Sequence, residues 1–250
     1  METPVRVLLV GAAGRMGQAI TRAADDVADI EIQAGANRGD AIEDAVADCD
    51  VVIDFSHADA TERNCAAAVT SGKPIVIGTT GHSSAQLEII EKTSLRVPVI
   101  LAANFSVGVN TLFWLSRRAA ELLGDSFDIE IVETHHRLKK DAPSGTAKRL
   151  AQLLAEARRL SYADNVAHGR EGQVGERPAD EIGVHAVRGG DVVGEHTVIF
   201  AGSGERLELT HKASSRDTFA VGALRAALWV VGQPAALYSM EDVLGLSACE

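Results

Sequence analysis

Fifteen consecutive residues, from Glu133 to Ala147, contain two histidines, three cations and the start of a predicted helix. The imidazoles of His135 and His136 can exchange protons near neutral pH, and Lys139 places a positive charge close to them. This combination suits a small dianionic substrate that must receive a proton. The alternative interpretation is a solvated basic turn before an ordinary helix, because such turns are common on protein surfaces.

Two predicted elements position these side chains. Polar and apolar residues alternate from Asp128 to Thr134, which predicts a half-buried strand, and residues 135–141 then form a loop at its end. Ser144 is a good N-cap for a helix whose apolar positions continue to Leu154. A helix N-terminus presents unpaired N–H groups and a partial positive charge, and Gly145 lets a ligand approach that backbone closely.

A second candidate site lies near the N-terminus. The apolar run Val5–Val10 predicts a buried parallel strand. Glycines spaced G-x-x-G-x-x-G follow at residues 11–17, and a helical pattern continues to about Ala24. Strand, glycine turn and helix are the setting of a dinucleotide site, in which the helix N-terminus holds the pyrophosphate. The motif alone is a weak signal, because a glycine turn between a strand and a helix needs no ligand.

The end of the next predicted strand, Ile30 to Ala36, bears on the choice of cofactor. NAD sites usually carry Asp or Glu about 20 residues after the glycines, whereas this chain has Asn37 and Arg38 there. The missing carboxylate removes repulsion against a 2′-phosphate, and Arg38 can pair with one. This favours NADPH, or tolerance of NADPH and NADH. Alternatively, Arg38 stacks on the adenine or lies in solvent.

Strands and helices alternate along the first part of the chain, which predicts an α/β fold with a Rossmann-like, doubly wound parallel sheet. Further strands are expected at residues 51–55, 74–78 and 98–102, and helices at residues 60–69 and 84–93. The glycine turn Gly78–Gly81 ends a strand and is expected to form a wall of the cofactor site. A long helix is predicted after Asn110, ending near Gly124.

Beyond residue 124 the pattern changes to longer strands that alternate polar and apolar residues. Strands are predicted at residues 128–134, 182–188, 192–200 and 206–211, with hairpin turns at residues 189–191 and 202–204. We expect a central α+β domain, with an open antiparallel or mixed sheet, one helix packed on it, and a solvent face that neighbouring subunits cover. Residues 161–180 show no clear element and predict a mobile loop or subunit contact. A helix from Thr218 to Val231 is expected to return the chain to the first domain.

Composition narrows the classes of protein to consider. The 250 residues are 46% hydrophobic, enough for one large domain or two smaller ones, and the net charge of −11 argues against nucleic acid or an anionic membrane as a partner. Cys49, Cys65 and Cys249 form no disulfide framework and no zinc spacing, so we expect no metal site and a cytoplasmic location. The first four residues do not predict a signal peptide, and no apolar run reaches the roughly 20 residues of a membrane span.

These motifs together resemble the 4-hydroxy-tetrahydrodipicolinate reductase family, also called dihydrodipicolinate reductases, of bacterial diaminopimelate and lysine biosynthesis. The family marker E-x-H-H-x-x-K-x-D-A-P-S-G-T-A matches residues 133–147. Further matches are G-x-x-G-R-M-G at 11–17, D-F-S at 54–56, G-T-T-G at 78–81, N-F-S-V-G at 104–108, H-A-V-R-G-G-D-x-V-G-E-H at 185–196 and H-x-A-x-S-R at 211–216. The match is thin between residues 161 and 180.

The resemblance implies reduction of 4-hydroxy-tetrahydrodipicolinate, via dihydrodipicolinate, to tetrahydrodipicolinate by NADPH or NADH, in a homotetramer. It implies a dinucleotide-binding domain of residues 1–106 and 216–250, and a substrate-binding and oligomerisation domain of residues 107–215. By the family pattern, His135 would be the proton donor and acceptor and Lys139 a proton donor. The groups implied to hold the substrate carboxylates are His136 and the backbone of Gly145 and Thr146. The implied cofactor-lining residues are Gly11, Ala12, Ala13, Gly14, Arg15, Met16, Gly78, Thr79, Thr80, Ala102, Ala103, Asn104 and Phe105.

Family members often carry an acidic residue near Asn37, where this chain has none, so the cofactor preference stays open. Two other functions stay open as well. One is a nicotinamide oxidoreductase for a different cyclic imine or oxo acid, although an enzyme for a monocarboxylate would not need the whole helix-start site. The other is a redox-sensing regulator without catalysis, but a sensor has no use for the proton donors His135 and Lys139, and no basic DNA-binding helix is evident.

Overall fold

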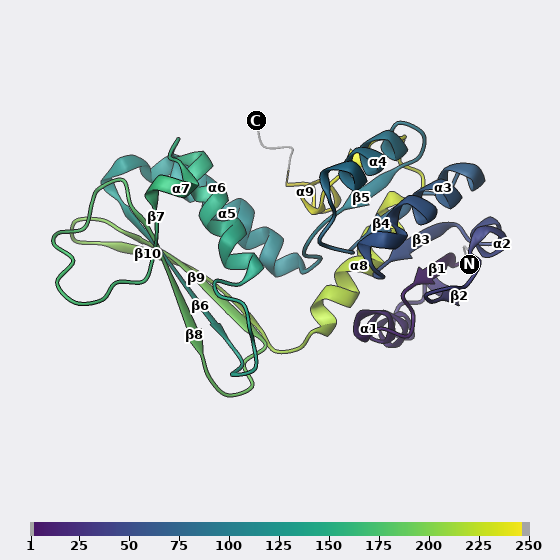
Figure 1. Cartoon of the computed structure of the whole chain (residues 1–250), viewed down its shortest axis with the longest axis horizontal. Helices are drawn as coiled ribbons and strands as arrows, with labels where there is room; N and C mark the ends of the chain where they lie inside the picture. The colour runs from purple at the N-terminus through teal and green to yellow at the C-terminus, as the bar shows by residue number, and fades with distance from the viewer. Residues whose placement is uncertain (1–2, 247–250) are drawn as a thin grey trace. The chain divides into compact units, whose positions relative to one another are not determined.

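The computed structural model describes residues 3–246, and the chain divides into two compact units. One unit contains the described residues up to Val107 and from Arg216 onward, and the other contains Gly108 to Ser215. Each unit has its own sheet and helices (Figure 1).

The first unit is built on a six-stranded sheet in the order β11-β5-β4-β3-β1-β2, and all of its strand pairs are parallel. Its strands are β1 (Val5–Val10), β2 (Ile30–Ala36), β3 (Val51–Asp54), β4 (Ile75–Ile77), β5 (Val99–Leu101) and β11 (Leu237–Tyr238). The predicted doubly wound parallel sheet is therefore confirmed. Strand β11 was not predicted, because two residues carry no recognisable pattern.

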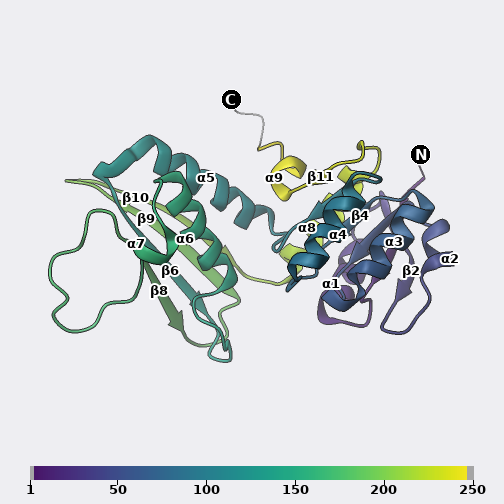
Figure 2. The same ribbon diagram turned by 45° about the horizontal axis from the view of Figure 1, so that its top comes forward.

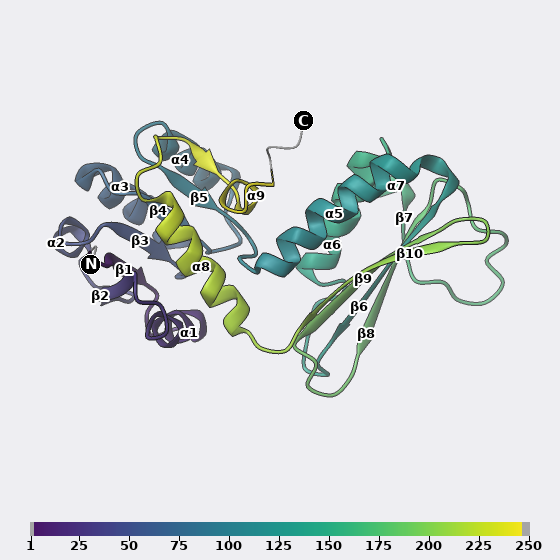
Figure 3. The ribbon, with the colours of Figure 1, turned by 180° about the vertical axis from the view of Figure 1, so that it is seen from behind.

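Helices cover both faces of this sheet. They are α1 (Arg15–Ala24), α2 (Glu43–Ala47), η1 (Ala58–Ala60), α3 (Thr61–Ser71), α4 (Ser84–Ser94), α8 (Asp217–Val230) and α9 (Met240–Val243). Alternate residues of β1 serve two cores: Val7 and Leu9 pack with α1 and α8, whereas Leu8 and Val10 pack with α2, α3 and α4. Burial on both faces explains why these strands are continuous apolar runs. Figure 3 shows α8, the predicted returning helix, lying across the sheet.

The second unit contains a five-stranded mixed sheet in the order β10-β9-β6-β8-β7. Its strands are β6 (Asp128–His135), β7 (Val166–His168), β8 (Ile182–Arg188), β9 (Gly194–Ala201) and β10 (Arg206–Ala213). Strands β9 and β10 form the predicted hairpin around residues 202–204. The hairpin predicted at residues 189–191 is wrong, because β6 lies between β8 and β9 and pairs with both. A local turn pattern carries no information about a third strand inserted between two others.

Two helices, not the single one predicted, pack against this sheet (Figure 1). The helical elements of the unit are α5 (Val107–Leu123), η2 (Gly124–Ser126), α6 (Gly145–Ala157) and α7 (Tyr162–Asn165). Leu112 of α5 and Leu150 of α6 share one core with Ile131 of β6. Helix α5 also begins at Val107 rather than after Asn110, since the turn before it is already closed by the Ser106 N–H, which donates to Asn104 Oδ1 at 2.9 Å.

The segment expected to lack any element, residues 161–180, contains α7 and β7, and a wide loop follows them (Figure 2). Both elements are too short to be recognised from periodicity. Arg170 and Arg177 attach the loop to Glu130 of β6 with N–O distances of 2.6 and 2.9 Å. Burial raises the pKa of Glu130, but the hydrogen bonds from Arg170, His185 and Arg177 outweigh it and lower the pKa to about 2.

Candidate active site

The glycine turn between β1 and α1 is packed so tightly that side chains do not fit. Gly11 has φ +87°, and a Cβ there would lie 2.4 Å from the carbonyl oxygen of Phe55. A Cβ on Gly17 would lie 2.3 Å from the carbonyl oxygen of Gly11. The glycines therefore allow the first turn of α1 to approach β1 closely, as a dinucleotide turn requires.

The same turn is attached to the end of β2. The Gly11 N–H donates to Ala36 O at 2.8 Å, and the Ala13 N–H donates to Asn37 Oδ1 at 2.8 Å. Helix α1 starts after Gly14, which provides no side-chain cap. The first N–H groups of α1 have no acceptor within the helix, so its positive end suits a pyrophosphate. The sequence-predicted residues Ala12 to Met16 all belong to this turn and helix start.

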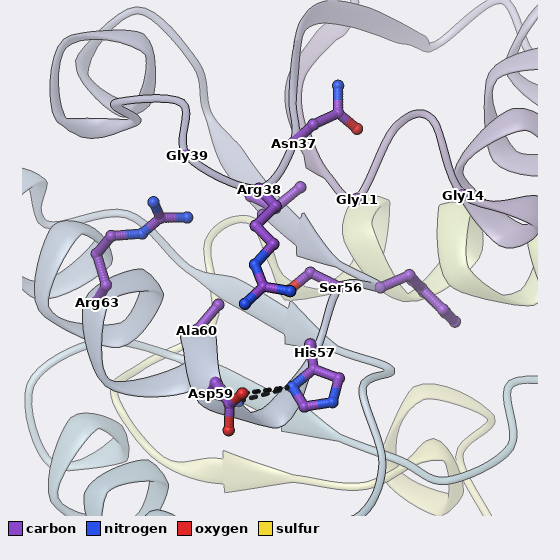
Figure 4. A pocket seen from close by; sticks show the side chains of 12 residues that line it. Gly11, Gly14, Asn37, Arg38, Gly39, Ser56, His57, Asp59, Ala60 and Arg63 are labelled. Atoms are coloured by element: carbon purple, nitrogen blue, oxygen red, sulfur yellow. Dashed lines mark hydrogen bonds and ion pairs between the residues drawn. The ribbon is translucent and has the colours of Figure 1, made fainter.

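A cavity of about 450 Å³ lies beside the turn, next to the carboxyl ends of β1, β2 and β3 (Figure 4). Its lining is Val10, Gly11, Gly14, Asn37, Arg38, Gly39, Phe55, Ser56, His57, Asp59, Ala60 and Arg63. Ligands of doubly wound sheets bind at this edge. Three of the predicted cofactor residues, Gly11, Gly14 and Arg38, thus come together at one cavity. Figure 4 shows the Arg38 side chain extending into the cavity and Asn37 pointing away from it.

Part of this cavity was not predicted from the sequence. The segment after β3 supplies Ser56, His57, Asp59 and Arg63, and His57 Nδ1 lies 3.1 Å from Asp59 Oδ2. The sequence contained a signal for this part of the cavity. The D-F-S motif stands at the end of the buried strand β3, which pairs with β1. Polar residues at that edge of a parallel sheet are expected to face the ligand.

The buried carboxylate of Asp54 joins this segment to the second glycine turn. Asp54 is 0% exposed and accepts hydrogen bonds from Ser56 N–H at 2.9 Å, Asn64 Nδ2 at 2.9 Å and Thr79 Oγ1 at 3.2 Å. The Ser56 N–H also lies 3.0 Å from Thr79 Oγ1. Thr79 is therefore a neighbour of the cavity wall, although it does not line the cavity.

Ala12, Ala13, Arg15 and Met16 are absent from the cavity lining among the described residues, although they lie in the turn and helix start beside it. Also absent are Gly78, Thr80, Ala102, Ala103, Asn104 and Phe105. They follow β4 and β5 at the same edge of the sheet. Phe105 is only 2% exposed, and its ring packs 5.4 Å from that of Phe55. The Phe105 side chain thus belongs to the core, and its carbonyl packs against Gly222, where an added Cβ would overlap it.

Gly17→Ala is expected to destabilise the protein and to weaken cofactor binding at least about tenfold. The added Cβ would meet backbone atoms of Gly11 and Ala12, which move only with the whole turn, and overpacking typically costs about 1–3 kcal/mol. Thermal melting and fluorescence titration with NADPH measure the two effects. Gly14→Ala, whose Cβ would lie 3.1 Å from Gly11 O, should lower the melting temperature less. Unchanged melting and affinity in Gly17→Ala would contradict this account of the turn.

The second site lies in the other unit, where β6 ends and α6 begins. His135 is the last residue of β6, and Lys139 follows in a turn closed by its N–H, which donates to His136 O at 3.1 Å. Lys139 Nζ lies 2.9 Å from Asp141 Oδ1. Ser144 caps α6 as predicted, since its Oγ accepts the Ala147 N–H at 3.2 Å. The end of β6 and the loop that follows it thus carry the two predicted proton donors.

The start of α6 is open to a ligand. An added Cβ on Gly145 would meet nothing within 4 Å, and the thirteen-residue helix presents its positive end there. His136 lies in the same loop, and its N–H donates to Val192 O at 2.7 Å. Its Nδ1 is buried without a hydrogen-bond partner among residues 3–246. A negatively charged ligand group at this helix start fits the donors present.

The side chain of His135 is 11% exposed, and its Nδ1 lies 2.5 Å from Oε2 of Glu133. Burial lowers the pKa of His135, and Lys139 and Arg188 lower it further, whereas Glu133 opposes the shift. The adjacent His196 is almost fully buried, and burial lowers its pKa to about 4, so this ring is neutral near pH 7. His196 is therefore held neutral in this pair, which leaves His135 as the candidate for proton exchange.

Within residues 3–246, no helix is both long and apolar enough to cross a membrane. No group of three or more metal-binding side chains is found in that range either.

The fold and the two sites define a Rossmann-type oxidoreductase that uses a nicotinamide dinucleotide. Residues 5–105 match the family profile described as "Dihydrodipicolinate reductase, N-terminus", and residues 108–244 match "Dihydrodipicolinate reductase, C-terminus". The chain therefore belongs to the dihydrodipicolinate reductase family.

Individual relatives agree with this assignment. A 4-hydroxy-tetrahydrodipicolinate reductase of Akkermansia muciniphila is 56% identical over 97% of this chain and 99% of its own length. One of Syntrophobacter fumaroxidans is 47% identical over 97% of this chain and 99% of its own length. The fold matches the solved dipicolinate-bound dihydrodipicolinate reductase from Paenisporosarcina sp. TG-14 with a TM-score of 0.77, at 24% identity over 95% of this chain and 98% of that one.

Proposed function

We propose that this oxidoreductase reduces 4-hydroxy-tetrahydrodipicolinate, via dihydrodipicolinate, to tetrahydrodipicolinate in diaminopimelate and lysine biosynthesis. The observation that carries the proposal is the placement of His135 at the end of β6, Lys139 in the loop that follows and the start of α6 directly after that loop. Family membership supports the same reaction. In this proposal the first unit binds the cofactor, and the second unit binds the substrate and forms the oligomer.

The residues of the second unit have distinct roles in the reaction. The N–H groups of Gly145 and Thr146, at the positive end of α6, bind a substrate carboxylate together with His136. Loss of water from 4-hydroxy-tetrahydrodipicolinate gives the conjugated imine ring of dihydrodipicolinate, whose C4 would accept the hydride that a nicotinamide would supply when bound. His135 and Lys139 then face an enamine-like anion on the substrate. Lys139 stabilises its negative charge, and His135 delivers the proton.

The proposed cofactor preference is NADPH, and two residues of the cavity support it. Arg38 extends into the cavity and has no hydrogen bond or ion pair with another described residue (Figure 4). The side-chain oxygen of Asn37 is engaged by the Ala13 N–H at 2.8 Å, so Asn37 holds the turn. The free guanidinium of Arg38 favours a 2′-phosphate, whereas the carboxylate of Asp59, which also lines the cavity, and that of Asp40, which accepts the Asn37 N–H at 2.8 Å, oppose one. The cofactor-binding set in this proposal comprises Arg38 and residues 11–16, 78–80 and 102–105.

Arg38→Ala is expected to raise KM for NADPH about 10–100-fold and to leave KM for NADH within about threefold, because a charge-assisted hydrogen bond contributes about 1.5–3 kcal/mol. Initial rates with each cofactor give both constants. Arg96→Ala, on a turn after α4 and exposed, is the control and should change neither value. Equal increases in KM for NADPH and NADH would mean that Arg38 contacts the part of the molecule that the two cofactors have in common.

Partners and location follow the family. We propose that the protein forms a homotetramer and that it is located in the cytoplasm. The face of β6 opposite α6 supports the tetramer, because Asp128, Glu130, Val132 and Thr134 remain partly exposed there. Light scattering of the purified protein measures the mass in solution. A monomer at micromolar concentration would contradict the tetramer.

The reaction itself is tested by following consumption of NADPH and NADH in parallel. The substrate is generated in place from pyruvate and aspartate semialdehyde by the preceding synthase. Turnover with either cofactor supports the reductase, and the ratio of the two kcat/KM values tests the Arg38 argument. Tight cofactor binding without turnover would favour a different imine substrate or a non-catalytic role.

A further inference from the structure

Glu133 is a completely buried carboxylate, 0% exposed, for which the proposed reaction has no direct task. It shares a face of β6 with His135, because residues two apart in a strand point the same way. An ionised carboxylate in a protein interior is costly unless charges and hydrogen bonds compensate for it. Its place next to the proposed acid therefore calls for a physical explanation.

Four donors converge on the Glu133 carboxylate. Oε1 accepts hydrogen bonds from Arg188 Nη2 at 2.8 Å and from the Ser144 N–H at 3.0 Å. Oε2 accepts one from Arg188 Nη1 at 2.8 Å and lies 2.5 Å from His135 Nδ1. Burial raises the pKa of Glu133, but Arg188, His135 and Ser144 together lower it below its usual value. The carboxylate is therefore ionised and held from β8, from the start of α6 and from its own strand.

An ionised carboxylate only accepts hydrogen bonds, so the proton of the His135–Glu133 contact is on Nδ1. In the neutral ring, Nε2 then carries the lone pair. Proton exchange with a substrate is confined to Nε2, the nitrogen that does not face Glu133.

The His135 ring is also confined on its other sides. Gly194 of β9 offers no side chain, and a Cβ there would lie only 3.0 Å from His135 Nε2. The ring of His196 packs against that of His135 edge-on, with centroids 5.2 Å apart. His196 Nε2 in turn lies 3.0 Å from Ser144 Oγ. Ser144 thus touches the surroundings of His135 twice, through its backbone to Glu133 and through its hydroxyl to His196.

We propose that Glu133 is a positioning residue that fixes the tautomer and orientation of His135 and helps it to hold a proton, and that Arg188 and Ser144 hold Glu133 in place. The inference rests on the proposed role of His135 in the reaction. The charged or titratable groups facing the ring are Glu133, Arg188, Lys139 and His196. Of these groups, Glu133 carries the negative charge. This charge stabilises the protonated ring, whereas burial, Arg188 and Lys139 destabilise it.

The variant Glu133→Gln makes this inference testable, because the geometry dictates how the amide must lie. Two donors that cannot reverse their role, Arg188 Nη2 and the Ser144 N–H, face the Oε1 position, whereas only one, Arg188 Nη1, faces the Oε2 position, so the amide oxygen takes the Oε1 place. The NH₂ group then occupies the Oε2 position and donates to His135 Nδ1. The neutral ring must accept at Nδ1 and carry its proton on Nε2. Loss of the negative charge also lowers the pKa of His135, by about one unit or more.

The first experiment is long-range ¹H–¹⁵N NMR of histidine-labelled, ligand-free protein, with His135 assigned from the signal lost in His135→Gln. Wild type should show the Nδ1–H tautomer. Glu133→Gln should show the Nε2–H tautomer and a lower titration midpoint, and Glu133→Asp should retain Nδ1–H. An Nε2–H tautomer in the wild type would overturn the inference without any variant. An unchanged His135 tautomer and titration midpoint in Glu133→Gln would also overturn it.

The control is Glu130→Gln, on the same strand but on the opposite face. Glu130 also has arginine and histidine partners, namely Arg170, Arg177 and His185. Loss of its charge should leave the tautomer and titration of His135 unchanged. An equal change in both variants would identify a general disturbance of β6 and refute a specific role for Glu133.

The kinetic arm follows kcat against pH. In Glu133→Gln, the pH range over which kcat falls with rising pH should move about one unit or more to lower pH. At pH values above that range, kcat should be at least about tenfold lower than in the wild type. The KM for the substrate should remain nearly unchanged. A reduced kcat with an unmoved pH range would indicate a merely structural role. An inverted tautomer with unchanged kcat would instead refute the proposed role of His135, so the two proposals can fail separately.

Discussion

His135→Gln is expected to lower kcat about 10²–10⁴-fold, which is the contribution of a positioned acid. Glutamine has a similar size, and its NH₂ group can donate to Glu133 as His135 Nδ1 does, so KM for the substrate and Kd for NADPH should stay within about threefold. Burial lowers the pKa of His135, and the protonated ring is lost as the pH rises through that lowered value. The wild-type kcat should therefore fall with rising pH over this range, and the variant should lack that limb. Steady-state rates from pH 5 to 9 measure both effects.

A surface histidine provides the matched control for this prediction. His168→Gln alters an exposed ring on β7 and should leave kcat and its pH dependence unchanged. A wild-type rate in His135→Gln would contradict the assignment of the acid and move the proton donor to another group of the loop, with Lys139 the first candidate.

Lys139→Ala is expected to reduce kcat and substrate affinity together, with a loss in kcat of about 10²–10³-fold, since preorganised donors aimed at developing charge have effects of this size. The ammonium lies 2.9 Å from Asp141 Oδ1 and its side chain is 19% exposed, so it is already oriented within the loop. Its removal also leaves the Asp141 carboxylate unpaired near the anionic substrate, which should raise KM. Cofactor binding should remain nearly intact, as measured by NADPH fluorescence.

Lys140→Ala is the comparison for this variant, because the neighbouring lysine is exposed and makes no hydrogen bond or ion pair within the described residues. It changes the same net charge one position away and should lower kcat less than about threefold. If both lysine variants lost activity equally, general attraction of a dianion by the basic loop would explain the effect, and Lys139 would have no specific role.

The sequence determined the parallel sheet, the glycine turn and the histidine–lysine loop of this protein. These features depend on local chemistry: strands buried on both faces are continuous apolar runs, a tight turn needs glycine, and Ser144 caps the helix that follows it. The family marker is local as well, since all of its residues lie within one strand, one loop and one helix start. This is why the elements on either side of the marker could be placed almost to the residue.

Tertiary structure alone decided how separate segments meet. The placement of β6 between β8 and β9 overturned the hairpin predicted at residues 189–191, and the packing of α5 beside α6 could not be read from either helix alone. The cavity lining from the segment after β3 and the donors around Glu133 likewise come from residues far apart in the chain. Hydrogen bonds and packing between distant segments leave no periodic pattern in the sequence. The candidate acid was therefore recognisable from the sequence, whereas the buried carboxylate network that orients it was recognisable only in the fold.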